Sequence, residues 1–231
     1  MKRELNIALI GCGNWGKNIA RNLHQMGSLA CIYDTNSMLS KKLSHEYNLP
    51  IFEINKIFED KNINGIVIAS PAKTHKDLAI QSLKNGKDVF IEKPFCLSLL
   101  DAQMLSELAI VRNRVLMVGH LINYHNAFIK MKQLIKNGKI GIPQNIRANR
   151  LALGTIRSEE SVIYDLSAHD ISMILSITEE LPIDVNVQSI HHHNNIGPDA
   201  ICVKLLFSRG LTALINSDWM CPYKEHKFSA I

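Results

Sequence analysis

The chain has 231 residues, of which 46% are hydrophobic and 20% are charged. This balance excludes a disordered or low-complexity chain and predicts a soluble globular protein of one large or two modest domains. The formal net charge of +5 is mild, and the basic residues are scattered along the chain. The composition therefore favours no nucleic-acid partner, although it suits a small anionic ligand.

The cysteines and the N-terminus predict the compartment. Five cysteines occur without any C-x-x-C pair, which favours reduced thiols over a disulfide framework. The N-terminal Met-Lys-Arg-Glu lacks the apolar length of a signal peptide. No stretch approaches the ~20 apolar residues of a membrane span. We therefore expect a cytoplasmic protein with no membrane partner.

The first apolar run, Leu5–Ile10, leads into Gly11–Gly16, which reads G-x-G-x-x-G, and a helical pattern follows. This order is typical of the strand, turn and helix start of a dinucleotide-binding unit. Gly11 would allow the sharp turn, Gly13 the approach of a pyrophosphate, and Gly16 close helix packing. The helix N-terminus would offer N–H groups to the phosphates. The alternative is a glycine-rich turn with no ligand. The strand predicted before it and the helix predicted after it favour dinucleotide binding.

Residues 14–27 predict a helix with one apolar face, formed by Trp15, Ile19, Leu23 and Met26. Residues 29–33 predict a strand that ends at Asp34. An acid about 20 residues beyond the glycine turn is expected to hold the adenosine ribose. Its charge would repel a 2′-phosphate, which favours NAD over NADP. The alternative is that Asp34 caps a helix predicted over 38–47. Lys41 and Lys42 in that helix leave NADP open as the cofactor.

Two further apolar runs, at 64–69 and 87–91, are continuous rather than alternating. Such runs are typical of parallel strands that are covered on both faces. Helical patterns follow them, through Leu83 and over about 98–112, and another strand is predicted at 115–118. Strand and helix therefore alternate along this region, which predicts a doubly wound parallel sheet of the Rossmann type.

The pattern changes at His120. Helices are predicted at 123–137 and 161–178, with strands at about 145–153, 183–191, 200–207 and 211–219. The last three strands follow one another without crossover helices, which favours an antiparallel sheet.

We therefore expect an α/β chain of two domains. A Rossmann domain would span 1–120, and an α+β domain with a largely antiparallel open sheet would span 121–231. Residues 219–231 predict a connection and the beginning of another strand, with no closing element, so we expect this second domain to be incomplete.

Glu92-Lys93-Pro94 follows the strand at 87–91, at the sheet edge where ligands bind in such folds. A lysine there can hydrogen-bond a substrate hydroxyl or exchange a proton with it. Pro94 restricts Lys93 to extended geometry. The alternative is a charged strand end that leads into a turn.

Asp165 and His169 are spaced i, i+4 on the helix predicted over 161–178. They would share one face, so a carboxylate could orient an imidazole that titrates near neutral pH. The alternative is a polar helix edge that faces solvent. The apolar stripe of this helix is predicted at Val162, Leu166, Met173 and Ile177.

His191-His192-His193 suggests a metal site, but neighbouring residues of a strand point to opposite faces. No carboxylate or cysteine lies at ligand spacing. We therefore expect a polar cluster at a loop edge and no metal. Cys12, inside the glycine turn, is expected to be a small packing residue rather than a nucleophile.

These motifs occur in an order that resembles the Gfo/Idh/MocA oxidoreductases. They are the glycine turn, Ser70-Pro71 with His75, Glu92-Lys93-Pro94, and Asp165 followed by His169-Asp170. The resemblance covers essentially the whole chain. The segments Val118–Leu121, Tyr124-His125 and Asp165–Ser172 are similar to the branch that oxidises C3 of UDP-N-acetylglucosamine or its uronate.

The resemblance implies an NAD-dependent sugar dehydrogenase that forms a homo-oligomer, a dimer or a tetramer. It implies a catalytic set of Lys93 and His169 with Asp165 beside them, and it leaves open which of the first two is the base. The implied cofactor set is Gly11, Gly13, Asn14, Trp15, Gly16, Asp34, Ser70, Pro71, His75, Glu92 and Lys93. The implied substrate set is Lys93, Tyr124, His125, Asp165 and His169.

The chain also departs from the usual family pattern. Members often carry arginine, proline and an acid where Asn123, Asn126 and Ser172 stand, and they are usually longer. These differences leave the sugar open. The alternatives are an inositol or simple aldose dehydrogenase, a net non-redox reaction that uses NAD, or a non-catalytic NAD-binding paralogue or fragment.

Overall fold

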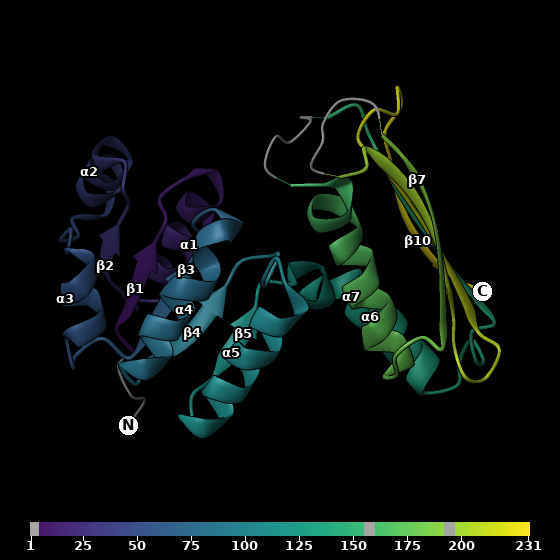
Figure 1. The fold of residues 1–231 in the computed structure, drawn as a ribbon, viewed down its shortest axis with the longest axis horizontal. Helices are drawn as coiled ribbons and strands as arrows, with labels where there is room; N and C mark the ends of the chain where they lie inside the picture. Colours follow the sequence, from purple (N-terminus) through teal and green to yellow (C-terminus); the bar gives the residue numbers. More distant parts are fainter. Residues whose placement is uncertain (1–4, 155–159, 192–196) are drawn as a thin grey trace. The chain divides into compact units, whose positions relative to one another are not determined.

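The computed structural model describes residues 5–154, 160–191 and 197–231 (Figure 1). Contacts divide the chain into two compact units, Met1–Gly119 and His120–Ile231. Each unit has its own sheet and its own hydrophobic core. Within the part of the chain described, no helix has the length and apolar character needed to cross a bilayer.

The first unit contains a parallel five-stranded sheet in the order β2-β1-β3-β4-β5. This confirms the predicted Rossmann-type sheet. Its strands are β1 (Ile7–Ile10), β2 (Leu29–Tyr33), β3 (Gly65–Ile68), β4 (Asp88–Ile91) and β5 (Leu116–Val118).

Helices connect the strands and cover both faces of this sheet. Along β3, Ile66 and Ile68 pack in a cluster with residues of α4 and α5, whereas Val67 packs in a cluster with residues of α1 and α2. A strand covered on both faces needs a continuous apolar run, which is the pattern in the sequence. The helices are α1 (Asn14–Gln25), α2 (Ser37–Tyr47), α3 (Ile54–Glu59), α4 (His75–Lys84) and α5 (Leu99–Val111), and α3 was not predicted.

The buried face of α1 differs from the predicted one. Trp15 and Met26 are 44% and 72% exposed, whereas Gly16, Ala20 and Leu23 are buried. Small residues lie toward the sheet because α1 runs very close to the turn that precedes it. The predicted face was right at Ile19 and Leu23, which pack in the core, and wrong at Trp15 and Met26. Periodicity weighs side chains by hydrophobicity, whereas here the contact at the start of the helix favours the smallest ones.

The second unit contains a mixed, mostly antiparallel sheet in the order β10-β6-β9-β8-β7. Only β6 and β9 pair in parallel among the described strands of this sheet. A tight hairpin turn joins β8 to β9, where Gly210 has φ +79° and Phe207 N–H donates to the Leu211 carbonyl. The strands are β6 (Asn145–Leu151), β7 (Asp184–Ile190), β8 (Ala200–Leu206), β9 (Thr212–Asp218) and β10 (Glu225–Ala230).

The helices of the second unit are each preceded by a turn of different pitch. A 3₁₀ turn over Leu121–Tyr124 comes before α6 (Asn126–Lys136), and a π-helical segment over Ile163–Ser167 comes before α7 (Ala168–Thr178). Phe128 of α6 packs edge-on against Phe228 of β10, with ring centroids 5.8 Å apart. The continuous helices predicted at 123–137 and 161–178 were therefore wrong in detail, although their positions were right.

Helix α5 offers a direct test of the first core. Leu105 is fully buried, whereas Leu100 on the same helix is 75% exposed. We expect Leu105→Ala to lower the free energy of unfolding by about 2–5 kcal/mol, because the truncation leaves a cavity. We expect Leu100→Ala to change it by less than ~0.5 kcal/mol. Urea unfolding followed by circular dichroism measures both, and equal losses would contradict this burial.

Candidate active site

The glycine turn after β1 is built on two contacts that no side chain could share. A Cβ on Gly16 would lie 2.0 Å from the carbonyl oxygen of Gly11. A Cβ on Gly11, whose φ is +100°, would lie 2.5 Å from the Ala69 backbone. Gly13 is different, since its φ is −67° and a Cβ there would meet nothing within 4 Å. The protein itself does not require a glycine at this position, so the open space suits a ligand that approaches the backbone.

A cavity of about 630 Å³ opens beside this turn. It lies at the carboxyl ends of β1, β2 and β3, and β1 is the strand between the other two. The chain reverses its direction of winding there, which is where open parallel sheets bind their ligands. The volume lies in the range of small-molecule sites. Its lining includes Gly11, Gly13, Asp34, Leu39, Ile54 and Ser70.

Asp34 is fixed by two backbone donors at the rim of this cavity. Its carboxylate accepts from Cys12 N–H at 2.6 Å and from Asn36 N–H at 2.7 Å. The cap of α2 is Asn36, whose side chain accepts from Met38 N–H at 3.0 Å. The alternative of Asp34 as the helix cap is therefore wrong. Each carboxylate oxygen keeps a further lone pair. Asp34 can therefore still accept hydrogen bonds from ribose hydroxyls.

Cys12 is fully buried in the same turn. Burial, with a smaller effect of the Asp34 charge, raises the pKa of its thiol to about 12. A thiol with so high a pKa is a poor nucleophile at neutral pH, as expected for a packing residue.

His75, the first residue of α4, is 1% exposed. Its Nδ1 lies 2.9 Å from the Pro94 carbonyl oxygen, and its Nε2 lies 2.9 Å from the Ser70 carbonyl oxygen. The Ser70 hydroxyl lies 2.6 Å from the Thr74 hydroxyl. Both ring nitrogens of His75 therefore face main-chain carbonyls, of which a neutral ring donates to one, a role that its position in the sequence did not indicate.

The Glu92-Lys93-Pro94 segment leaves the end of β4. Glu92 is 7% exposed, and its Oε1 accepts from the Trp15 indole N–H at 2.6 Å. Its Oε2 accepts from Lys93 N–H at 3.3 Å. Burial raises the pKa of Glu92, although the two hydrogen bonds and the Lys93 charge oppose that shift. Lys93 itself is half-buried at the ligand-binding edge of the sheet.

Asp165 and His169 lie on either side of a change in helix pitch. Asp165 belongs to the π-helical segment, and His169 is the second residue of α7. The pitch is wider there because Ala168 N–H bonds the carbonyl of Ile163, five residues back. The simple i, i+4 geometry of an α-helix therefore does not apply to this pair. Both residues are half-buried, so neither lies on a fully exposed helix edge.

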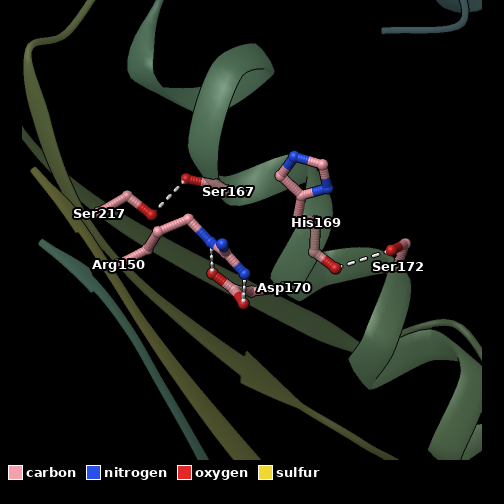
Figure 2. Close-up of polar contacts among 6 residues, drawn as sticks. All are labelled: Arg150, Ser167, His169, Asp170, Ser172 and Ser217. Carbon is pink, nitrogen blue, oxygen red and sulfur yellow. Dashed lines mark hydrogen bonds and ion pairs between the residues drawn. The ribbon is translucent and has the colours of Figure 1, made fainter. Parts of the chain in front are cut away.

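A buried ion pair holds α7 to its sheet beside His169 (Figure 2). Arg150 of β6 donates to both oxygens of Asp170, at 2.9 and 2.8 Å, and the two side chains are 13% and 3% exposed. A buried hydrogen bond of 2.8 Å joins Ser167 to Ser217 of β9. The role of Arg150 was not predicted from the sequence. The available signal was an arginine in the middle of a predicted strand, in a domain that also contains the His169-Asp170 pair.

The remaining candidates are more exposed. Tyr124 is 63% exposed, and the exposed His125 caps α6 by accepting from Ala127 N–H at 3.3 Å. His191 is exposed just after β7, while His192 and His193 lie outside the described residues. Residues 5–154, 160–191 and 197–231 hold no group of three potential metal ligands.

Two family models match nearly the full chain. The model described as an oxidoreductase family with an NAD-binding Rossmann fold matches residues 5–120, and the GFO/IDH/MocA C-terminal domain matches residues 128–231. The chain belongs to the Gfo/Idh/MocA oxidoreductase family. The resemblance drawn from the motifs is confirmed, as is the NAD-binding fold of the first unit.

Individual relatives are named as sugar and inositol dehydrogenases. The chain is 28% identical over 189 residues to UDP-N-acetylglucosamine 3-dehydrogenase of Acidithiobacillus ferrooxidans, covering 81% of this chain and 58% of that protein. It is 27% identical over 180 residues to scyllo-inositol 2-dehydrogenase (NAD(+)) of Bacillus subtilis, covering 74% and 53%. The chain thus spans little more than half the length of these curated relatives.

Solved structures share the fold. That of the Acidithiobacillus ferrooxidans UDP-N-acetylglucosamine 3-dehydrogenase GnnA has a TM-score of 0.90 at 24% identity, covering 99% of this chain and 74% of that chain. That of GenD2 from gentamicin A biosynthesis, in complex with NAD, has a TM-score of 0.87 at 21% identity, covering 99% and 72%.

The ion pair beside His169 generates a stability prediction. Removing one partner leaves a buried charge without compensation, so Arg150→Met should lower the free energy of unfolding by about 3–5 kcal/mol. Adding Asp170→Leu should restore part of that loss, because two apolar residues can replace such a pair. Urea unfolding of both variants measures this. A double variant less stable than the single one would show that the pair is not coupled.

Proposed function

We propose that this chain acts as an NAD-dependent sugar dehydrogenase, which moves a hydride between a hydroxyl-bearing sugar carbon and nicotinamide. The observation that carries the proposal is Lys93 at the carboxyl end of β4, on the same sheet edge as the open glycine turn. A cofactor fold and a proton-carrying side chain at one edge are what the reaction requires. The names of the sugar and inositol dehydrogenase relatives support it.

The residues around the glycine turn fit NAD. The Gly13 backbone and the first N–H groups of α1, from Asn14 to Gly16, are suited to hold a pyrophosphate. Asp34 offers carboxylate lone pairs to the ribose hydroxyls and would repel a 2′-phosphate, which makes NADP the less favoured cofactor. Ser70 and Pro71 belong to the same cavity. NAD, when bound, supplies the acceptor for the hydride.

Proton transfer falls to the side chains. One of Lys93 and His169 takes the proton from the substrate hydroxyl, and the other hydrogen-bonds the same oxygen. Asp165 accompanies His169 as a carboxylate partner. Tyr124 and His125 complete the proposed substrate contacts, with the exposed Tyr124 ring suited to stack on a sugar or a base.

The proposed substrate is a UDP-N-acetylhexosamine or its uronate, oxidised at C3. The 28% identity to a UDP-N-acetylglucosamine 3-dehydrogenase supports this choice. An inositol is the second candidate, because inositol 2-dehydrogenases of Bacillus subtilis and Thermotoga maritima are each 27% identical. We also propose a cytoplasmic homo-oligomer, a dimer or a tetramer, formed through the open sheet of the second unit.

Gly13 provides a test of cofactor binding. Because a Cβ there meets nothing within 4 Å, Gly13→Ala should leave the melting temperature unchanged. It should weaken NAD binding at least about 10-fold in calorimetric titrations, since the methyl group would occupy the approach to the pyrophosphate. Gly16→Ala is the contrast, because its Cβ clashes with backbone and should destabilise the fold itself. Unchanged NAD affinity in Gly13→Ala would contradict this site.

The reaction is tested by incubating the protein with NAD and a panel of UDP-sugars, inositols and free aldoses. We expect NADH formation, followed by its near-ultraviolet absorbance, with a UDP-N-acetylhexosamine or its uronate. Lys93→Ala should reduce turnover about 10²–10⁴-fold, the usual contribution of a positioned acid or base, while NAD still binds. Near-normal turnover in that variant would remove Lys93 from the mechanism, and an inositol as the best substrate would favour the second candidate.

A further inference from the structure

The segment that carries Lys93 is held on both sides by side chains from other elements. Before it, the buried Glu92 carboxylate accepts from the Trp15 indole, at 2.6 Å. After it, the Pro94 carbonyl oxygen lies 2.9 Å from the His75 ring. Trp15 comes from the first turn of α1 and His75 from the start of α4. Two helices therefore fix the residues on either side of Lys93.

Glu92 is packed as a fixed part rather than as a flexible surface acid. A Cβ on Gly119 would lie 3.0 Å from three atoms of its carboxylate group, so the end of β5 closes over it. Its second oxygen accepts from Lys93 N–H at 3.3 Å. The carboxylate thus links the Trp15 indole directly to the backbone of the lysine.

The indole bond also favours one charge state of Glu92. Burial raises the pKa of this carboxyl, and the N–H donated by Trp15 lowers it. Loss of the donor would favour the neutral acid, which accepts hydrogen bonds less strongly than a carboxylate. Trp15 therefore holds the group that contacts the Lys93 backbone in position, and its hydrogen bond favours the carboxylate form of that group.

His75 acts in the same way on the other side. Carbonyl oxygens only accept hydrogen bonds and a neutral imidazole carries one N–H, so the ring donates to the Pro94 or the Ser70 carbonyl according to which nitrogen carries the proton. The ring is almost completely buried, which leaves it little freedom. It ties the turn after β4 to the turn after β3.

We propose that Trp15 and His75 are positioning residues for Lys93, acting through Glu92 and the Pro94 carbonyl, respectively. This inference rests on the proposed function of Lys93. It extends the role of the glycine-turn tryptophan beyond cofactor binding, because its indole couples the phosphate-binding turn to the proton-carrying segment.

The experiment compares Trp15→Phe and His75→Gln with the wild type. Amide hydrogen exchange of a peptide spanning residues 90–97, read by mass spectrometry, should become faster in both variants, because exchange reports local opening. With an active substrate, kcat should fall about 10-fold or more while the Kd for NAD stays within about two-fold. Trp15→Phe keeps an aromatic ring but lacks the N–H donor and the second ring of the indole, and its half-exposed site allows the fold to persist.

Three controls make the result specific. Trp219→Phe removes the other indole hydrogen bond, to Asp199 in the second unit, and should leave exchange of the 90–97 peptide unchanged. Glu92→Gln keeps an acceptor for the indole and should retain slower exchange than Glu92→Leu, which should match Trp15→Phe. Unchanged exchange in Trp15→Phe overturns the proposal.

The kinetic outcome separates the two possible roles of Trp15. A rise in the Kd for NAD that matches the fall in kcat overturns the positioning role and assigns the residue to cofactor binding. If no sugar yields NADH with the wild type, the proposed function fails. The hydrogen-exchange measurements still decide whether Trp15 and His75 hold the segment.

Discussion

The arrangement of the first unit depends on the close approach of α1 to the turn that precedes it. The Gly11 carbonyl occupies space where any side chain at Gly16 would place its Cβ, 2.0 Å away. Only this approach presents the N-terminus of α1 at the carboxyl edge of the sheet. It also brings Trp15, one residue earlier, within hydrogen-bonding distance of Glu92, the residue after β4. The glycine turn and the Lys93 segment therefore share one structural origin.

The second unit organises its candidate residues by a different interaction. There the start of α7 is held by the bidentate Arg150–Asp170 pair and by the Ser167–Ser217 hydrogen bond (Figure 2). A buried pair contributes little net stability compared with apolar residues, but it tolerates only a narrow geometry. The π-helical segment adds a second constraint, because it changes the direction from which Asp165 leaves the helix. Such segments occur often at functional sites.

Several errors in the sequence-based expectations share one cause. Trp15 was assigned to the buried face of α1, but its indole reaches a carboxylate 77 positions away. Asp34 was a candidate helix cap, but Asn36 supplies the cap, and Asp34 instead accepts from the backbone of the glycine turn. Trp15 bonds a residue that is distant in sequence, and Asp34 gives up the cap position to a neighbouring asparagine. Local periodicity carries no information about either partner.

The sequence by itself determined the fold class, the family and the kind of cofactor. The continuous apolar strands, the alternation with helices and the glycine spacing depend on local geometry, which a pattern of residue types can encode. The tertiary structure alone decided which side chains hold the candidate residues. His75 bridges two turns, Glu92 is closed in by β5, and Arg150 meets Asp170 across 20 positions. These contacts form only when separate elements pack, because burial makes a polar group find a partner wherever the fold brings one.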